Sequence, residues 1–256
     1  LGQNFLVDSA ALARVIASAE VQPQDTVLEI GAGLGSLTRE LAKVAQRVVA
    51  VEVDRDLFQV LQETLGGVAN IDLRWGDILQ LAPGELAPAS NYLVVANIPY
   101  YITSALIRHL LEADQKPRRV VLTVQREVAQ RICAGPGELN LLALSVQVYG
   151  QPAITAQIPA GAFYPPPKVD SAVIRVDLFP EPAIPTERLD TFFRLIKAGF
   201  SQKRKMLRNT LSAGLRLSPA QAAELLRAAD IDPQRRAETI SIEEWKRLVE
   251  VMESPG

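Results

Sequence analysis

Short apolar runs alternate with stretches of helical spacing through the first half of the chain. Continuous apolar runs are typical of strands buried in a parallel sheet. Between them apolar residues recur at every third or fourth position, as in Leu37, Leu41 and Val44, which predicts amphipathic helices. The alternation favours an α/β fold with a parallel sheet. Strands are expected at 26–30, 48–53, 71–75, 92–96 and 120–124, and helices at 9–19, 36–45, 57–65, 104–113 and 125–134.

The pattern changes in the second half of the chain. Residues 141–149 and 171–179 predict two late strands, so we expect the sheet to end as a hairpin. The proline-rich segment 180–185 interrupts both periodicities, because proline lacks an N–H donor and has a fixed backbone angle. Beyond it the spacing is purely helical. We therefore expect a first domain over residues 1–180 and a small all-helical domain over residues 181–256.

Polar residues mark the starts of several predicted helices. Asp8 precedes the first helix and is expected to cap it. Ser218 with Gln221, and Ser241 with Glu244, have the spacing of capping boxes, in which side chains satisfy main-chain N–H groups at a helix start. Both boxes lie beyond the proline-rich segment and support its helical interpretation.

Composition excludes several classes of protein. The chain has 256 residues, of which 48% are apolar, so we expect a packed core rather than disorder. No apolar run approaches the roughly 20 residues that cross a bilayer, and no secretory leader is recognisable, so a cytoplasmic protein without membrane contact is expected. Cys133 and His109 are the only cysteine and histidine, which excludes an internal disulfide and argues against a metal site. We interpret Cys133 as a packing residue and His109 as a residue of a helix surface.

The distribution of charge is more informative than the net charge of −2. Residues 1–184 contain 14 basic and 19 acidic residues, whereas residues 185–256 contain 13 basic and 10 acidic ones. Residues 191–223 contain no acidic residue. This pattern favours a surface that binds phosphates over the alternative of an ordinary solvated helix face. The basic residues of this segment are Arg194, Lys197, Lys203, Arg204, Lys205, Arg208 and Arg216.

A glycine turn follows the first long strand, at Gly31-Ala32-Gly33-Leu34-Gly35. Such turns often only join a strand to a helix. In an open parallel sheet, however, the first of them is where a nucleoside approaches the backbone. Glu52, about 20 residues later at the end of the next strand, has the position of a ribose acceptor. Asp77 follows the third strand and could accept from an adenine amino group.

The glycine spacing alone does not identify the cofactor. The dinucleotide pattern Gly-x-Gly-x-x-Gly is absent, which disfavours a nicotinamide enzyme, and there is no phosphate loop with Gly-Lys-Ser or Gly-Lys-Thr. The carboxylate of Glu29, just before the glycines, would repel a pyrophosphate and could support a cationic group. S-adenosylmethionine carries an ammonium and a sulfonium, which fits this environment.

A second motif, Asn97-Ile98-Pro99-Tyr100-Tyr101, closes the fourth strand. An amide, a proline and two aromatics can hold an exocyclic amine and stack on the ring that carries it. The tetrapeptide from Asn97 to Tyr100 could also be only a turn after a strand. Together with the glycine turn it indicates group transfer to a base.

These motifs resemble the rRNA adenine N6-dimethyltransferases, and the likeness extends over nearly the whole chain. Within this family the C-terminal part resembles the branch that acts on small-subunit rRNA, the KsgA branch. The resemblance implies a Rossmann-like class I S-adenosylmethionine-dependent methyltransferase fold with a small all-helical C-terminal domain. The segments that carry it are 3–6, 29–35, 52–54, 76–78, 97–100, 163–171, 200–211 and 229–238.

The resemblance also implies roles for individual residues. The target adenine would be held by the Asn97 side-chain oxygen and the Ile98 carbonyl, in a loop stiffened by Pro99, with Tyr100 and Phe163 stacking on its two faces. Lys203, Arg204, Lys205 and Arg208 would bind RNA. Residues expected around S-adenosylmethionine are Gln3, Asn4, Leu6, Gly31, Gly33, Glu52, Asp77, Ile78 and Asn97.

The function implied is dimethylation of N6 in two adjacent adenines of the 3′-terminal hairpin of small-subunit rRNA. The expected substrate is a pre-30S particle, and the enzyme is expected to be a monomer without a metal. Alternatives are a large-subunit enzyme of the macrolide-resistance type, a non-catalytic ribosome assembly factor and, more distantly, a nicotinamide oxidoreductase. The loop has Ile98 and Tyr101 where many relatives have leucine and asparagine, a change that spares the main-chain role of position 98.

Overall fold

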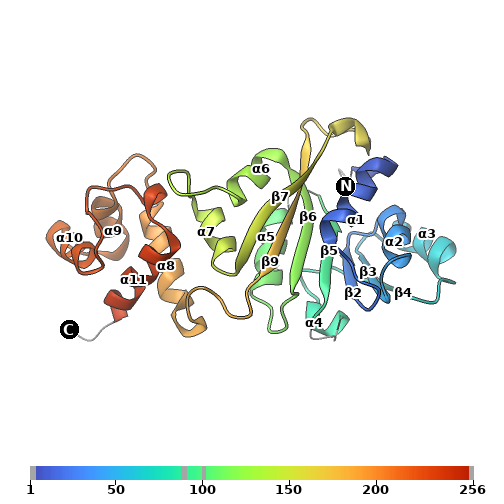
Figure 1. Cartoon of the computed structure of the whole chain (residues 1–256), viewed down its shortest axis with the longest axis horizontal. Coiled ribbons are helices and arrows are strands. Elements are labelled where there is room, and N and C mark those ends of the chain that lie inside the picture. Colours follow the sequence, from blue (N-terminus) through green and yellow to red (C-terminus); the bar gives the residue numbers. More distant parts are fainter. Residues whose placement is uncertain (1–3, 88–90, 100–101, 254–256) are drawn as a thin grey trace. The chain divides into compact units, whose positions relative to one another are not determined.

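A computed structural model describes residues 4–87, 91–99 and 102–253 (Figure 1). The chain forms two compact units. The first contains the residues up to 130 together with 151–178, and the second contains 131–150 together with the residues from 179 onward. The second unit therefore includes a segment that the expected division at residue 180 assigns to the first domain.

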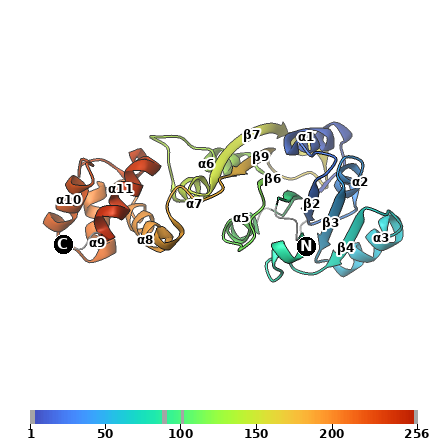
Figure 2. The ribbon, with the colours of Figure 1, turned by 60° about the horizontal axis from the view of Figure 1, so that its bottom comes forward.

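The first unit is built on a mixed sheet of seven strands in the order β4-β3-β2-β5-β6-β9-β7. The strands from β4 to β6 run parallel, and β9 is antiparallel to β6 (Figures 1 and 2). Their bounds are β2 Thr26–Ile30, β3 Arg47–Glu52, β4 Ile71–Trp75, β5 Leu93–Asn97, β6 Arg119–Gln125, β7 Gly150–Ile158 and β9 Ser171–Leu178. A separate two-stranded ribbon pairs β1, Phe5–Leu6, with β8, Phe163–Tyr164.

The helices of this unit follow the strands in alternation. They are α1 Ser9–Ala19, α2 Ser36–Ala42, α3 Arg55–Leu65, α4 Pro83–Leu86, α5 Thr103–Leu111 and α6 Arg126–Ile132, with the short helix η2 Ala160–Ala162. The Asp8 side chain accepts from the Ala11 N–H and caps α1, as predicted, and Asp54 caps α3 in the same manner. These caps fix where the helices begin.

The five strands predicted between residues 26 and 124 are confirmed, with shifts of one residue at some ends. The central strands could be recognised because both of their faces are buried. Val27, Leu28, Val48, Val94 and Val121 are fully inaccessible to solvent. Such strands produce the continuous apolar runs visible in the sequence.

The prediction of a strand at 141–149 is wrong. This segment is helix α7, Leu141–Gln147, and the Asn140 side chain caps it by accepting from the Ala143 N–H. The missed strand is β7, which lies at the edge of the sheet beside β9. Its residues are mostly exposed or half-buried, so the segment lacks the apolar run of a central strand. The last two strands of the sheet are therefore β7 and β9.

The second unit is helical in the described residues, and the helical prediction for the chain beyond residue 180 is confirmed. Its helices are α7, α8 Leu189–Gly199, α9 Leu207–Leu215, α10 Pro219–Ala228 and α11 Ile242–Glu253, with the short helices η3 Thr186–Arg188 and η4 Ala237–Thr239. Both predicted capping boxes are present, between Ser218 and Gln221 and between Ser241 and Glu244. The buried Trp245 of α11 packs against Gly199 of α8, where an added Cβ would lie 2.7 Å from the indole.

Candidate functional site

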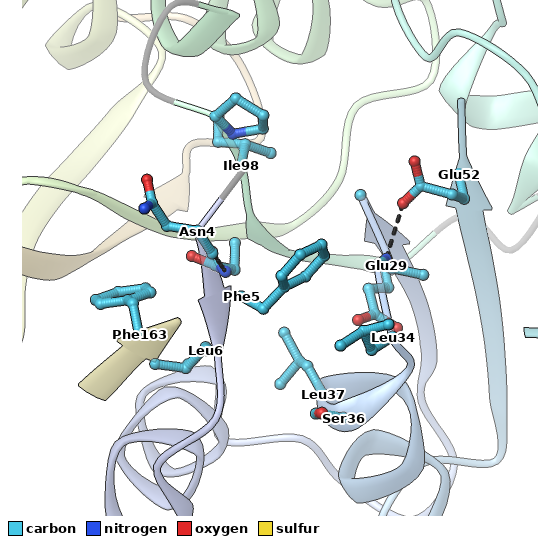
Figure 3. Close-up of a pocket in the computed structure, with 15 residues that line it drawn as sticks. Asn4, Phe5, Leu6, Glu29, Leu34, Ser36, Leu37, Glu52, Ile98 and Phe163 are labelled. Carbon is cyan, nitrogen blue, oxygen red and sulfur yellow. Dashed lines mark hydrogen bonds between the residues drawn. The ribbon is translucent and has the colours of Figure 1, made fainter. Parts of the chain in front are cut away.

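A pocket lies at the carboxyl ends of β2, β3 and β5 (Figure 3). This is the edge where open parallel sheets bind their ligands. The residues that line it come from the ribbon strands, the glycine turn, the start of α2 and the loop after β5. They are Asn4, Phe5, Leu6, Glu29, Gly31, Ala32, Gly33, Leu34, Ser36, Leu37, Glu52, Asn97, Ile98, Pro99 and Phe163.

The glycine turn adopts a conformation that favours glycine. Gly31, Gly33 and Gly35 have φ angles of +74°, +57° and +77°, in the left-handed region that disfavours residues with a Cβ. A Cβ on Gly33 would lie 3.2 Å from Cδ1 of Phe5, so the phenyl ring packs directly on this residue. The turn therefore exposes backbone to the pocket, with Phe5 as its apolar cover.

Glu52 connects the end of β3 to the glycine turn. Its side chain is buried, and Oε2 accepts a hydrogen bond of 2.8 Å from the Gly33 N–H (Figure 3). Oε1 accepts from the N–H groups of Val53 and Asp54, at 3.0 and 2.9 Å. Two carboxylate oxygens offer about four lone-pair sites, so three bonds leave acceptor capacity for a ligand hydroxyl.

Asn97 is held by the segment that precedes the ribbon. Its Nδ2 group donates to the main-chain carbonyl of Asn4 over 3.3 Å. Because this bond uses the amide nitrogen, the side-chain oxygen remains an acceptor. Ile98 is buried, and the Pro99 carbonyl accepts from the Ile102 N–H at 3.2 Å, which closes the loop toward α5.

The ribbon of β1 and β8 brings two distant motifs together. Leu6 is paired with Phe163, and Phe5 with Tyr164. Leu6 and Phe163 are both buried and line the pocket, whereas Tyr164 is 71% exposed. The chain continues after β8 into a proline-rich loop, residues 165–167, which is distinct from the segment 180–185. The Asn4 Nδ2 group donates to the Pro165 carbonyl at 2.6 Å and fixes this loop to the segment that precedes β1.

Asp77 and Ile78 are not among the residues that line this pocket. They follow β4, and the N–H of the preceding residue, Gly76, donates to the Glu52 carbonyl at 2.9 Å. Asp77 and Ile78 therefore lie close to Glu52, at the same end of the sheet. The Asp77 carboxylate accepts from the Leu79 N–H and the Gln80 side chain, and Ile78 is buried. Gln3 and Tyr100, also expected at the site, lie outside the described residues.

The expected negative charge on Glu29 needs correction. Its side chain is fully buried, and burial raises the pKa of the carboxyl to about 8, against a smaller lowering by weak hydrogen bonding from Thr38 and with a further raising by the charge of Glu52. Neither oxygen forms a well-aligned hydrogen bond with a described residue. Around pH 7 the protein surroundings alone therefore favour the neutral acid. The sequence interpretation treated this group as a carboxylate because burial is a tertiary property.

Sequence reasoning also missed Phe5, Ser36 and Leu37 as pocket residues. Phe5 lies inside the motif from Gln3 to Leu6, so its position was a usable signal. His109 lies elsewhere, with Nε2 2.9 Å from the Leu81 carbonyl, and burial raises the pKa of the Cys133 thiol. Among the described residues, no cluster of side chains could hold a metal ion. None of the helices described has the length and apolar character that a membrane crossing requires.

The basic residues predicted to bind RNA lie in the second unit. Lys203, Arg204 and Lys205 are exposed in the turn between α8 and α9, and Arg208 is half-buried in α9. Within the described part of the chain, none of these four forms an ion pair. Their charges are therefore available to an anionic partner.

Comparisons with known proteins agree on one family. The family model described as ribosomal RNA adenine dimethylase matches residues 1–254. The chain is 48% identical over 251 residues to ribosomal RNA small subunit methyltransferase A of Dehalococcoides mccartyi strain CBDB1, covering 97% of this chain and 86% of the relative. It is 41% identical to the protein of the same name from Alkaliphilus oremlandii, covering 96% and 88%.

Two solved structures share the fold over nearly the whole chain. The 23S rRNA methyltransferase ErmE is 30% identical with a TM-score of 0.78, covering 98% of this chain and 100% of its own. A dimethyladenosine transferase from Plasmodium falciparum is 24% identical with a TM-score of 0.78, covering 95% of each chain. The second likeness bears on the fold alone.

Proposed function

Because the chain belongs to the ribosomal RNA adenine dimethylase family, we propose that it dimethylates N6 of two adjacent adenines in the 3′-terminal hairpin of small-subunit rRNA. The protein is an rRNA methyltransferase. Relatives that carry the small-subunit name are 41–48% identical, whereas the enzyme named for 23S rRNA is 30% identical. This difference favours the small-subunit substrate over the resistance-type alternative.

S-adenosylmethionine is the methyl donor we propose. It supplies an electrophilic methyl group on a positively charged sulfur, and each transfer replaces one N6 hydrogen by methyl, leaving a neutral thioether and one proton. The pocket fits such a ligand, because its described lining contains two carboxyl groups, on Glu29 and Glu52, and no basic residue. A pyrophosphate-bearing cofactor would find no cation there. The glycine turn lets the ligand approach the backbone closely.

Individual residues would hold the donor in distinct ways. Glu52 uses its remaining acceptor capacity for the ribose hydroxyls, and Gly31 and Gly33 leave room beside the backbone. Asp77 accepts from the adenine amino group, and the Ile78 backbone fixes the same ring. Gln3, Asn4 and Leu6 border the methionine part by resemblance to the family.

The orientation of the Asn97 amide is the single observation that carries the catalytic proposal. With Nδ2 bonded to Asn4, the Asn97 oxygen and the Ile98 carbonyl can accept the two N–H bonds of the target amine. The lone pair of this nitrogen is delocalised into the purine, and two acceptors draw it toward tetrahedral geometry. Pro99 stiffens the loop, and Tyr100 and Phe163 would stack on the two faces of the base.

The energies make this arrangement feasible. Stacking on an aromatic side chain contributes roughly 1–3 kcal/mol per base, which is comparable with the few kcal/mol needed to unstack one nucleotide. The net free energy of moving the target adenine out of its stack and into the pocket is then close to zero. Correct positioning of N6 is therefore the main contribution we assign to Asn97 and Ile98.

The second unit would supply RNA affinity. Lys203, Arg204, Lys205 and Arg208 bind phosphates. Residues 181–256 act as the RNA-binding domain, and residues 1–180 act as the methyltransferase domain. A pre-30S particle as substrate, a monomeric enzyme and a cytoplasmic location complete the proposal.

Mass spectrometry of rRNA tests this function. The protein is incubated with labelled S-adenosylmethionine and, separately, with 30S and 50S particles that lack the modification. We expect two dimethylated adenines in 16S rRNA and none in 23S rRNA. Label in 23S rRNA would instead identify a resistance-type enzyme. Failure to bind S-adenosylmethionine by calorimetry, with intact particle binding, would identify an assembly factor.

A further inference from the structure

The wall of the pocket contains an acid that the proposed catalytic steps do not use. Glu29 is the penultimate residue of β2, followed by Ile30 and the glycine turn, and its side chain is completely inaccessible to solvent. Neither of its oxygens has a well-aligned hydrogen-bond partner among the described residues, although the group lines the pocket (Figure 3). A buried polar group without a partner is costly, so this arrangement calls for a ligand that completes it.

The surroundings of Glu29 contain no compensating cation in the described residues. Glu52 on β3 is the nearby charged group, and its effect disfavours ionisation of Glu29. On α2 the neighbour is Thr38, whose hydroxyl is also buried without a well-aligned bond. The paired residues on β3 and β5 are Ala50 and Val95, and the ribbon contributes Asn4 and Phe5 to the same pocket. The described residues therefore supply no positive charge to Glu29, and the cation we assign to this position comes from a ligand.

We propose that Glu29 recognises the positive charge of the methyl donor and releases a proton when that donor binds. This inference rests on the proposed function and adds proton linkage to it. A cation in the pocket stabilises the ionised carboxyl, whereas the protein groups alone stabilise the neutral acid. Glu29 thus adapts its charge to the ligand beside it.

The linkage distinguishes the donor from its product. S-adenosylmethionine carries one more positive charge than S-adenosylhomocysteine, whose sulfur is neutral, while both have the same amino acid group. Glu29 therefore ionises to a greater extent beside the donor than beside the product, which keeps only the ammonium. Donor affinity rises more steeply with pH, up to the pKa of Glu29, than product affinity does.

Calorimetry in buffers of different ionisation enthalpy measures this proton directly. With a pKa of about 8, roughly nine-tenths of Glu29 is protonated at pH 7, so the donor should release up to about 0.9 proton and the product fewer. Below pH 8 the donor affinity should fall about tenfold for each unit of pH. Glu29→Gln, a neutral side chain of the same shape, should abolish both effects.

The outcomes separate the two proposals. Donor binding by the wild-type protein without proton release, or with the same release for donor and product, overturns the role of Glu29 and leaves the methyltransferase function intact. Equal proton release by Glu29→Gln and the wild type also overturns it. Absence of donor binding in the wild type contradicts the proposed function itself. The comparison of donor with product needs only the wild-type protein, so it decides the matter even if the variant does not fold.

Discussion

The side-chain amide of Asn97 donates a hydrogen bond to the main-chain carbonyl of Asn4, which lies 93 positions earlier in the chain. Asn4 in turn donates through its own side chain to the Pro165 carbonyl. The loop after β5, the start of the ribbon and the proline-rich loop are thus connected through one residue. Because the acceptor on Asn4 is a main-chain group, the orientation of Asn97 does not depend on the Asn4 side chain.

Asn97→Ala should remove methyl transfer while sparing the fold. Loss of the acceptor that positions N6 should lower the single-turnover rate by about 100-fold or more, since misplacement by about 1 Å has that effect. Rapid-quench assays with labelled donor on 30S particles measure the rate, and calorimetry should place donor affinity within tenfold of the wild type. Asn4→Ala keeps the carbonyl and should retain a much larger share of the rate. Full turnover by Asn97→Ala would exclude the proposed role of the amide.

Glu52→Ala should weaken both stability and donor binding. The Gly33, Val53 and Asp54 N–H groups would lose their acceptor, and leaving a buried donor unsatisfied costs about 1–3 kcal/mol. Chemical denaturation should show this loss of stability. Calorimetry should show donor affinity reduced at least about 100-fold, which corresponds to a loss of about 2.7 kcal/mol in binding free energy. Glu63→Ala, at an exposed position of α3, is the control and should change neither. Unchanged stability in Glu52→Ala would contradict the structural part of this assignment.

Gly35→Ala should destabilise the first unit, because Gly35 is the N-cap of α2 and has a left-handed backbone conformation. Gly35 has a φ of +77°. A Cβ added there would lie 2.6 Å from the side chain of Leu65 and 2.9 Å from that of Leu61, two buried residues of α3. Left-handed strain of about 1–2 kcal/mol and overpacking of about 1–3 kcal/mol should combine to a loss of roughly 2–5 kcal/mol. Denaturant titration measures it. Gly67→Ala, with no atom within 4 Å of the added Cβ, should change stability by less than about 1 kcal/mol.

The sequence predicted the central strands and the glycine turn because their signals are local. A strand buried on both faces is mostly apolar, as residues 27–28 of β2 and 48–51 of β3 are, and the turn after β2 needs glycine for its backbone angles. The edge strand β7 escaped detection because it is mostly exposed and mixes polar with apolar residues, so it has no continuous apolar run, while the apolar segment before it is equally consistent with the helix it forms.

Long-range features of the site could not be derived from the sequence. The pairing of Leu6 with Phe163 joins segments at opposite ends of the first unit's sequence, and it places Phe5 over Gly33. The protonation of Glu29 depends on its complete burial by surrounding elements. The resemblance to the family supplied the residue set, whereas the hydrogen bonds of Asn97 and Glu52 required the structure.

Changing Lys203, Arg204 and Lys205 together to alanine should weaken RNA binding without affecting the donor. Each contact with a phosphate releases counterions from the RNA when the protein binds. Loss of these contacts should therefore decrease the magnitude of the slope of log affinity against log salt by about 2–3. Filter binding to 30S particles over a salt series measures the slope, and calorimetry measures donor affinity. A second triple variant, with Lys43, Lys116 and Lys246 changed to alanine, has the same net charge and should retain most of the affinity. Equal loss of RNA and donor binding would refute this division of labour.

Glu29 should make the stability of the protein decrease as the pH rises. The folded-state pKa of about 8 lies above the unfolded value of 4.5, so the folded state binds more protons between these values. Stability is therefore unaffected by this group below about pH 4.5, falls as the pH rises toward 8 and then levels off. The total loss of stability is at most about 5 kcal/mol, because each pH unit between the two pKa values contributes about 1.36 kcal/mol. Glu29→Gln cannot ionise, so its free energy of unfolding, measured by urea titration from pH 5 to pH 9, should exceed that of the wild type increasingly as the pH rises. Parallel curves for the two proteins would show that Glu29 is ionised throughout.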